Sequence, residues 1–193
     1  IFLGYLAAVT LVVMVFWQSI PEFGILLTDH VLAAGLILGM AAAYERFGGR
    51  FWLLVRSWYP LLFVTMAFRE LFYLVHRVNP HDADAWLMGI DLKVFGTHPT
   101  VWLERFLHPA LTEYLQVVYS SYYFIPVLVV GLIYARRSRD RFDEAMSVTL
   151  LGFFVSYVGY FLVPAIGPRF TMAHLQTVPL EGYGLFEVLR LSL

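Results

Sequence analysis

The chain has 193 residues, of which 60% are apolar, 18% aromatic and only 14% charged, and its mean hydropathy is +0.72. Soluble domains average about 45–50% apolar and about 25% charged residues, so this composition predicts an integral membrane protein. A net charge of −1 gives no electrostatic reason to expect a nucleic-acid partner. The absence of cysteine excludes disulfides, thiolate metal ligands and a cysteine nucleophile.

Five segments are apolar over about 20 residues, the length that an α-helix needs to cross a bilayer. In chain order they are residues 1–20, 25–43, 52–76, 111–135 and 145–163. Two shorter helices are expected at 81–91 and 99–109; the second is too short to cross and is predicted to lie in the membrane interface. The predicted fold class is therefore an all-α, polytopic membrane helix bundle with five visible spans. Both ends of the chain lie in apolar runs, so we expect residues 1–193 to be a single transmembrane domain cut from a longer protein.

Basic residues concentrate in two loops. The loop between the second and third spans contains Arg46, Arg50 and Arg56, and the 136–141 loop contains four more, which together make seven of the 13 Lys and Arg residues. Strict alternation of five spans puts both loops on one side, and the excess of Lys and Arg predicts that this side is cytoplasmic. The N-terminus is then cytoplasmic as well, while residues 77–109 and everything after Pro164 face the outside of the cell (inner) membrane.

The third span carries two adjacent ionisable residues, Arg69 and Glu70, deep in an apolar stretch. Charges at that depth are expensive unless they are paired, and they usually mark function. Neighbours in a helix do not face each other, so the two residues need different partners. Helical spacing groups Arg69 with His76 and directs them toward Arg77 at the outer end. Substrate binding and a structural ion pair between helices are both open for this group.

An Arg follows directly after the end of the fifth span, in the sequence Gly167-Pro168-Arg169. Glycine and proline end the helix, so Arg169 is expected at the outer interface. Its planar guanidinium suits a phosphate, because it can donate two parallel hydrogen bonds to an oxyanion. The alternative is an interfacial arginine that only anchors lipid headgroups.

Tyrosines gather in the outer part of the fourth span. Tyr119 and Tyr123 are the two that we carry as candidate substrate-binding residues, beside Tyr114 and Tyr122. Tyrosines near a membrane interface usually form an aromatic belt, which is the alternative for this group. A third cluster, His81, Asp82 and Asp84, has none of the spacing of a zinc site; we expect helix capping and surface polarity there, and no metal.

Three segments in this order resemble the type 2 phosphatidic acid phosphatase superfamily, and most closely its inositolphosphotransferase-like branch, which is related to inositol phosphorylceramide synthases. The first is Asp84-Ala-Trp-Leu-Met-Gly-Ile-Asp91 leading to Phe95-Gly-Thr-His-Pro99. The second is Leu111-Thr-Glu-Tyr-Leu-Gln-Val-Val-Tyr-Ser-Ser-Tyr-Tyr-Phe124. The third is Gly159-Tyr-Phe-Leu-Val-Pro-Ala-Ile-Gly-Pro-Arg-Phe170.

The resemblance implies a six-helix core whose site lies at the membrane surface. It also implies metal-independent phosphoryl transfer without a cofactor, in which one histidine forms a phosphohistidine and a second protonates the leaving group. The family's histidine motifs, Pro-Ser-x-His and Ser-Arg-x5-His-x3-Asp, do not occur between Ile1 and Leu193, so no catalytic residue is assigned.

The resulting hypothesis is the N-terminal part of a membrane lipid phosphatase or phosphotransferase that acts on a phosphorylated lipid at the extracytoplasmic face. Its expected partners are the lipid bilayer and the phosphorylated lipid substrate. The alternative is a non-catalytic membrane subunit that binds lipid or partner helices. A transporter ranks third, because we expect no inverted repeat and no Gly- or Pro-broken helix pair.

Overall fold

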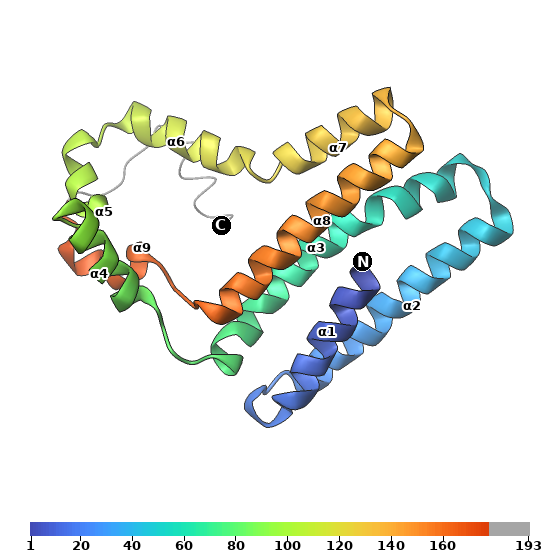
Figure 1. The fold of residues 1–193 in the computed structure, drawn as a ribbon, viewed down its shortest axis with the longest axis horizontal. Helices are drawn as coiled ribbons and strands as arrows, with labels where there is room; N and C mark the ends of the chain where they lie inside the picture. The colour runs from blue at the N-terminus through green and yellow to red at the C-terminus, as the bar shows by residue number, and fades with distance from the viewer. Residues whose placement is uncertain (178–193) are drawn as a thin grey trace. The chain divides into compact units, whose positions relative to one another are not determined.

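The computed structural model describes residues 1–177, which form nine α-helices, three short 3-10 helices and no strand (Figure 1). The prediction of an all-α protein is confirmed for this part of the chain. Its helices belong to two compact units. The first unit comprises Ile1–His81 and Asp140–Pro164, and the second comprises Asp82–Arg139 and the described residues 165–177.

The first unit contains the long helices. They are α1 (Phe2–Val15), α2 (Phe23–Phe47), α3 (Gly49–Val78) and α8 (Arg139–Leu162), with a 3-10 turn at Trp17–Ser19. The second unit contains shorter helices. They are α4 (Asp84–Phe95), α5 (Pro99–Leu103), α6 (Pro109–Ser121), α7 (Ile125–Arg136) and α9 (Pro168–Thr171), with 3-10 turns at Glu104–Phe106 and Ala173–Leu175. The two short helices expected at 81–91 and 99–109 are thus present as α4 and as α5 with its following turn.

The prediction of five straight spans is wrong in two places. Among residues 1–177, only α2, α3 and α8 are long and apolar enough to cross a membrane alone, and α6 with α7 make a fourth if that bent pair is one span. The expected first span is a helix of only 14 residues, because the chain turns at Trp17–Ser19. The expected span at 111–135 is divided into α6 and α7, whose axes differ by 48°.

The break between α6 and α7 has a local cause in Pro126, the second residue of α7. Proline has no N–H to donate, and its ring clashes with the carbonyl of the residue four positions earlier, so it kinks or breaks a helix; α3 continues past Pro60, whereas the chain breaks before Pro126. The N–H groups of Tyr122, Tyr123 and Phe124 instead donate to carbonyls three residues before them, at 3.2, 3.3 and 2.9 Å. The expectation of one continuous span at 111–135 is therefore wrong at Pro126.

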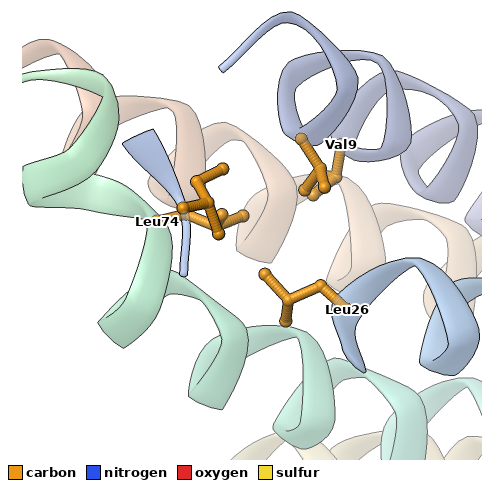
Figure 2. Close-up of a cluster of buried hydrophobic side chains, with 5 residues drawn as sticks. Val9, Leu26 and Leu74 are labelled. Atoms are coloured by element: carbon orange, nitrogen blue, oxygen red, sulfur yellow. The ribbon is translucent and has the colours of Figure 1, made fainter. Parts of the chain in front are cut away.

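The core of the first unit lies where α1, α2 and α3 meet. Figure 2 shows Val9 of α1, Leu26 of α2 and Leu74 of α3 pointing toward one another. Val13 and Ile20 complete this buried cluster. Lipid is as apolar as these side chains, so the cluster stabilises the helix packing through close van der Waals contact rather than through exclusion of water.

Helix α8 runs alongside α3 in the first unit (Figure 1). Two side-chain hydrogen bonds join them: Tyr157 Oη donates to the carbonyl of Val64 at 2.9 Å, and Asn79 Nδ2 donates to the carbonyl of Phe161 at 3.0 Å. Interhelical hydrogen bonds in membranes contribute about 0.6–2 kcal/mol each. Because each bond ends on a backbone carbonyl, it fixes the axial position of one helix against the other.

Candidate functional site

The segment that carries Arg169 is held at both ends by carboxylates of the second unit. At its start, Asp84 of α4 accepts hydrogen bonds from the backbone N–H groups of Ile166 and Gly167 at 2.9 and 2.8 Å. At its end, Glu104 accepts from the N–H and the hydroxyl of Thr177, at 3.1 and 2.9 Å. These contacts fix the backbone on both sides of Arg169.

Asp84 is the more tightly enclosed of the two carboxylates, because its residue is only 6% exposed. Each of its oxygens accepts one N–H, and hydrogen bonds to a charged acceptor are worth about 1.5–3 kcal/mol. Helix α4 begins at Asp84 without a side-chain cap. The expectation of capping and surface polarity is therefore wrong for Asp84, since its carboxylate is buried against a turn 82 residues further along the chain. No sequence pattern predicted that Asp84 would bind the backbone of the turn at Ile166 and Gly167.

Gly167 shapes the turn that Asp84 holds. Its backbone has φ +94° and ψ 160°, a region that is essentially restricted to glycine. Its carbonyl accepts hydrogen bonds from the N–H groups of Phe170 and Thr171 at 3.1 and 3.2 Å, and these start α9. Pro168 follows at the first helical position, where its missing N–H is not needed. The Gly-Pro pair thus begins a new short helix after α8 has ended at Leu162.

Arg169 lies in the first turn of α9 with an exposed side chain. Its guanidinium carbon is 5.6 Å from the centre of the Phe170 ring. Within residues 1–177 no carboxylate is within ion-pair distance of Arg169, so its N–H donors are available to an anion from outside the described chain. The location after the Gly-Pro turn is as the sequence predicted, and the phosphate-binding role stays a prediction.

Tyr119 and Tyr123 lie at the break between α6 and α7. Tyr119 is in the last turn of α6 and 62% exposed, and Tyr123 is in the linker and 46% exposed. The side-chain oxygen of Ser120, between them in sequence, is buried without a hydrogen-bond partner in the described chain. These polar groups therefore gather at a helix break rather than along the straight span that the sequence predicted.

Arg69, His76 and Arg77 all lie on α3 in the first unit, with exposed side chains. His76 and Arg77 are in the last turn of the helix. The spacing of 69 and 76 puts these two residues on one face, as expected. The six candidate residues therefore divide between the units: these three belong to the first, and Arg169, Tyr119 and Tyr123 belong to the second.

Glu70 has the interhelical partner that the sequence analysis left open. Its Oε1 lies 2.6 Å from Nε2 of His30 on α2, and Nδ1 of His30 lies 2.8 Å from the hydroxyl of Thr10 on α1. The three long helices of the first unit are thus joined by one polar chain. The sequence indicated this contact only indirectly, because Asp29 and His30 are the ionisable residues of an otherwise apolar second span.

The hydrogen bonds among Thr10, His30 and Glu70 indicate where the protons of these three side chains lie. The Thr10 hydroxyl has one hydrogen, which it donates to the carbonyl of Leu6 at 2.6 Å. Its oxygen therefore accepts from Nδ1 of His30, and the contact between Nε2 and Glu70 holds one further shared proton. The pair is neutral overall whichever atom carries that proton, as suits a group between membrane helices.

A cavity of about 290 Å³ lies beside this pair in the first unit. Residues of α1, α2 and α3 line it, and Arg69, Glu70 and His30 are among them. Within the part of the chain that the structure describes, no group of three or more His, Asp or Glu side chains is placed to hold a metal ion.

Comparison with known proteins identifies one family. A family model described as PAP2 superfamily matches residues 85–185, more than half of the chain. The matched segment begins next to Asp84 and includes Arg169, while α1, α2 and α3 lie outside it. No curated protein and no solved structure matches the chain.

Proposed function

The chain belongs to the PAP2 superfamily, and on that premise we propose that it is the N-terminal part of a membrane lipid phosphatase or phosphotransferase of the inositolphosphotransferase-like branch. The substrate is a phosphorylated lipid at the extracytoplasmic face. A histidine attacks the phosphorus, the bond to the leaving oxygen breaks, and a second histidine protonates that oxygen. Water or an alcohol then takes the phosphoryl group from the phosphohistidine. The proposal assigns both histidines to residues outside these 193.

The proposal rests chiefly on the position of Arg169 and on the hydrogen bonds that hold its turn. It lies inside the family-matched segment, on a turn whose backbone N–H groups are bound by the buried Asp84 carboxylate. A held backbone limits the positions that the guanidinium can reach, which lowers the entropy lost when it binds an oxyanion. An arginine that only anchored headgroups would gain little from such a support.

The remaining candidate residues are proposed to bind lipid within the unit to which each belongs. Tyr119 and Tyr123 offer hydroxyl donors at the α6–α7 break, inside the family-matched segment. Arg69, His76 and Arg77 offer cationic or polar groups on α3, toward the end that the arginine bias predicts to be outside. We propose Tyr119 and Tyr123 as contacts to the substrate headgroup or its phosphate, with Arg169 as the principal phosphate ligand, and Arg69, His76 and Arg77 as lipid-binding residues of the first unit.

The direct experiment uses the full-length protein in proteoliposomes with EDTA present. Phosphatidic acid and phosphatidylinositol are offered separately as phosphorylated donors, each with and without an acceptor alcohol, which is inositol or a ceramide. Release of inorganic phosphate indicates a phosphatase, and a new phosphorylated product that depends on the acceptor indicates a transferase. If correctly folded protein gives neither product from any lipid, the proposal is wrong and the lipid-binding subunit is favoured.

A further inference from the structure

The cavity of the first unit lies outside the family-matched segment and has its own chemistry. Two helices supply lining residues that are spaced so that they share one face. They are Glu22, Asp29 and Ala33 on α2 and its N-cap, and Met66 and Arg69 on α3. Because α2 and α3 are joined by a tight turn at Gly48 and run antiparallel (Figure 1), the charged ends of both sets lie toward the start of α2 and the end of α3.

The charged lining residues of the cavity lie toward one end, with Ile25 and Leu26 between Glu22 and Asp29, and the other end is apolar. Glu22, Asp29 and Arg69 line the polar end, and Ala33, Phe63 and Met66 line it further along the helices. Met66 is 62% exposed and continues the apolar wall onto the surface of the unit. A polar recess that opens onto an apolar surface matches an amphipathic molecule, with a headgroup inside and acyl chains outside.

The charges of the polar end lack partners within the described chain. The side chains of Glu22, Asp29 and Arg69 make no hydrogen bond or ion pair there, although acidic and basic groups line the same cavity. Glu70, the acid next to Arg69, is occupied by His30. Arg69 is nine residues from the end of α3, about 14 Å along the helix at 1.5 Å per residue. Unpaired charges at such depth are costly and point to a ligand.

We propose that this cavity binds the headgroup of a zwitterionic phospholipid, with its phosphate on Arg69 and its ammonium group on Asp29 and Glu22. A purely anionic headgroup would meet two carboxylates, and a purely cationic one would meet the guanidinium. A molecule that brings both charges neutralises both ends. The volume of about 290 Å³ is at the small end of ligand sites, so it holds a headgroup and leaves the acyl chains against the apolar surface.

Two further features of the cavity support this assignment. Tyr5 of α1 lines the cavity, and its hydroxyl is buried without a hydrogen-bond partner in the described chain, so a headgroup oxygen that reached this hydroxyl would satisfy it. The neutral His30–Glu70 pair adds no net charge to the cavity wall. The charge of the cavity lining therefore comes from Asp29, Glu22 and Arg69. The bound lipid is a resident molecule and is distinct from the substrate that the family-matched segment handles.

The experiment measures lipid retention rather than turnover. The purified protein is placed in nanodiscs of phosphatidylglycerol with increasing phosphatidylethanolamine, and native mass spectrometry counts the lipid that stays bound. Wild type is expected to retain phosphatidylethanolamine selectively. Arg69→Gln and Asp29→Asn should each weaken that retention about 10-fold or more, which corresponds to about 1.4 kcal/mol.

The controls separate this result from misfolding and from catalysis. Arg50→Gln on α3 and Glu45→Gln on α2 remove the same charges away from the cavity and should retain the lipid as wild type does. Asp29→Glu keeps the charge and should also retain it, with an unchanged unfolding temperature. Equal retention of phosphatidylglycerol, or loss with Arg69→Gln but not with Asp29→Asn, would overturn the zwitterion assignment. Phosphoryl transfer, measured in parallel, tests the proposed function separately.

Discussion

The buried carboxylate of Asp84 holds the backbone of Gly167: Oδ1 accepts the N–H of Gly167 at 2.8 Å, and Oδ2 accepts the neighbouring N–H of Ile166 at 2.9 Å. This contact joins the start of α4 to the turn that presents Arg169. It brings together two of the three segments that carry the family resemblance, and it gives the second unit a support for an anion-binding arginine.

Removing the Asp84 carboxylate should loosen this turn. In Asp84→Ala two backbone N–H groups lose a charged acceptor, at about 1.5–3 kcal/mol for each bond. We expect a lower unfolding temperature and faster proteolysis within residues 166–177. Asp84→Asn keeps one acceptor oxygen and should fall between. The matched control is Asp91→Asn on the same helix; if Asp84→Ala is as stable and as resistant as this control, the contact does not hold the turn.

Gly167→Ala should be destabilising by about 1–3 kcal/mol, because a side chain is strained at φ +94°. No atom lies within 4 Å of the position of the added Cβ, so the cost comes from the backbone and not from a clash. Gly159→Ala within α8 is the control, since its surroundings are equally open and its backbone is helical. Thermal unfolding in detergent should separate the two variants, and equal stability would contradict the strained conformation.

Glu70→Ala should destabilise the first unit far more than Glu144→Ala. The side chains of His30 and Glu70 are 6% and 13% exposed, whereas those of Arg141 and Glu144 are 69% and 61% exposed. Breaking a buried pair costs about 3–5 kcal/mol, and exposed pairs contribute about 0–1 kcal/mol. Denaturant unfolding of both variants measures the difference. Similar losses would mean that the pair does not join α2 to α3.

Membrane orientation can be tested with single cysteines in this cysteine-free chain. The arginine bias predicts that residue 139 is cytoplasmic and residue 97 is outside. Both hold only if the bent pair α6–α7 crosses the membrane, because three spans would leave the 136–141 loop on the outer side. An impermeant maleimide on intact cells should therefore label Thr97→Cys and not Arg139→Cys. Labelling at position 139 from outside would contradict the orientation.

The sequence predicted the features that depend on composition and local pattern. Apolar runs located α2, α3 and α8, an Asp-rich start located α4, and prolines and glycines located α5 and the turn before Arg169. The break at Pro126 was available from the same local rules, but the apolar run on both sides of this proline favoured one continuous span. The length of α1 was overestimated for the same reason, because the turn at Trp17–Ser19 lies inside an apolar run.

The contacts that organise the candidate site could not be predicted in the same way. Asp84 with Gly167, and His30 with Glu70, join residues 83 and 40 positions apart. A single sequence carries no signal for such pairs beyond the presence of a charge where one is costly. That signal marked Glu70 as needing a partner, and it failed for Asp84, which resembled a helix-start residue.

The proposed binding of a substrate phosphate by Arg169 is tested by kcat/KM of the full-length enzyme, measured at matched amounts of folded protein. Arg169→Ala removes charge-assisted hydrogen bonds and should lower kcat/KM about 10- to 100-fold, at about 1.4 kcal/mol for each tenfold. Arg169→Lys keeps the charge but loses the planar fork, so it should recover only part of the loss. If both variants turn over lipid phosphate like wild type, Arg169 is an interfacial anchor and the proposed phosphate site is wrong.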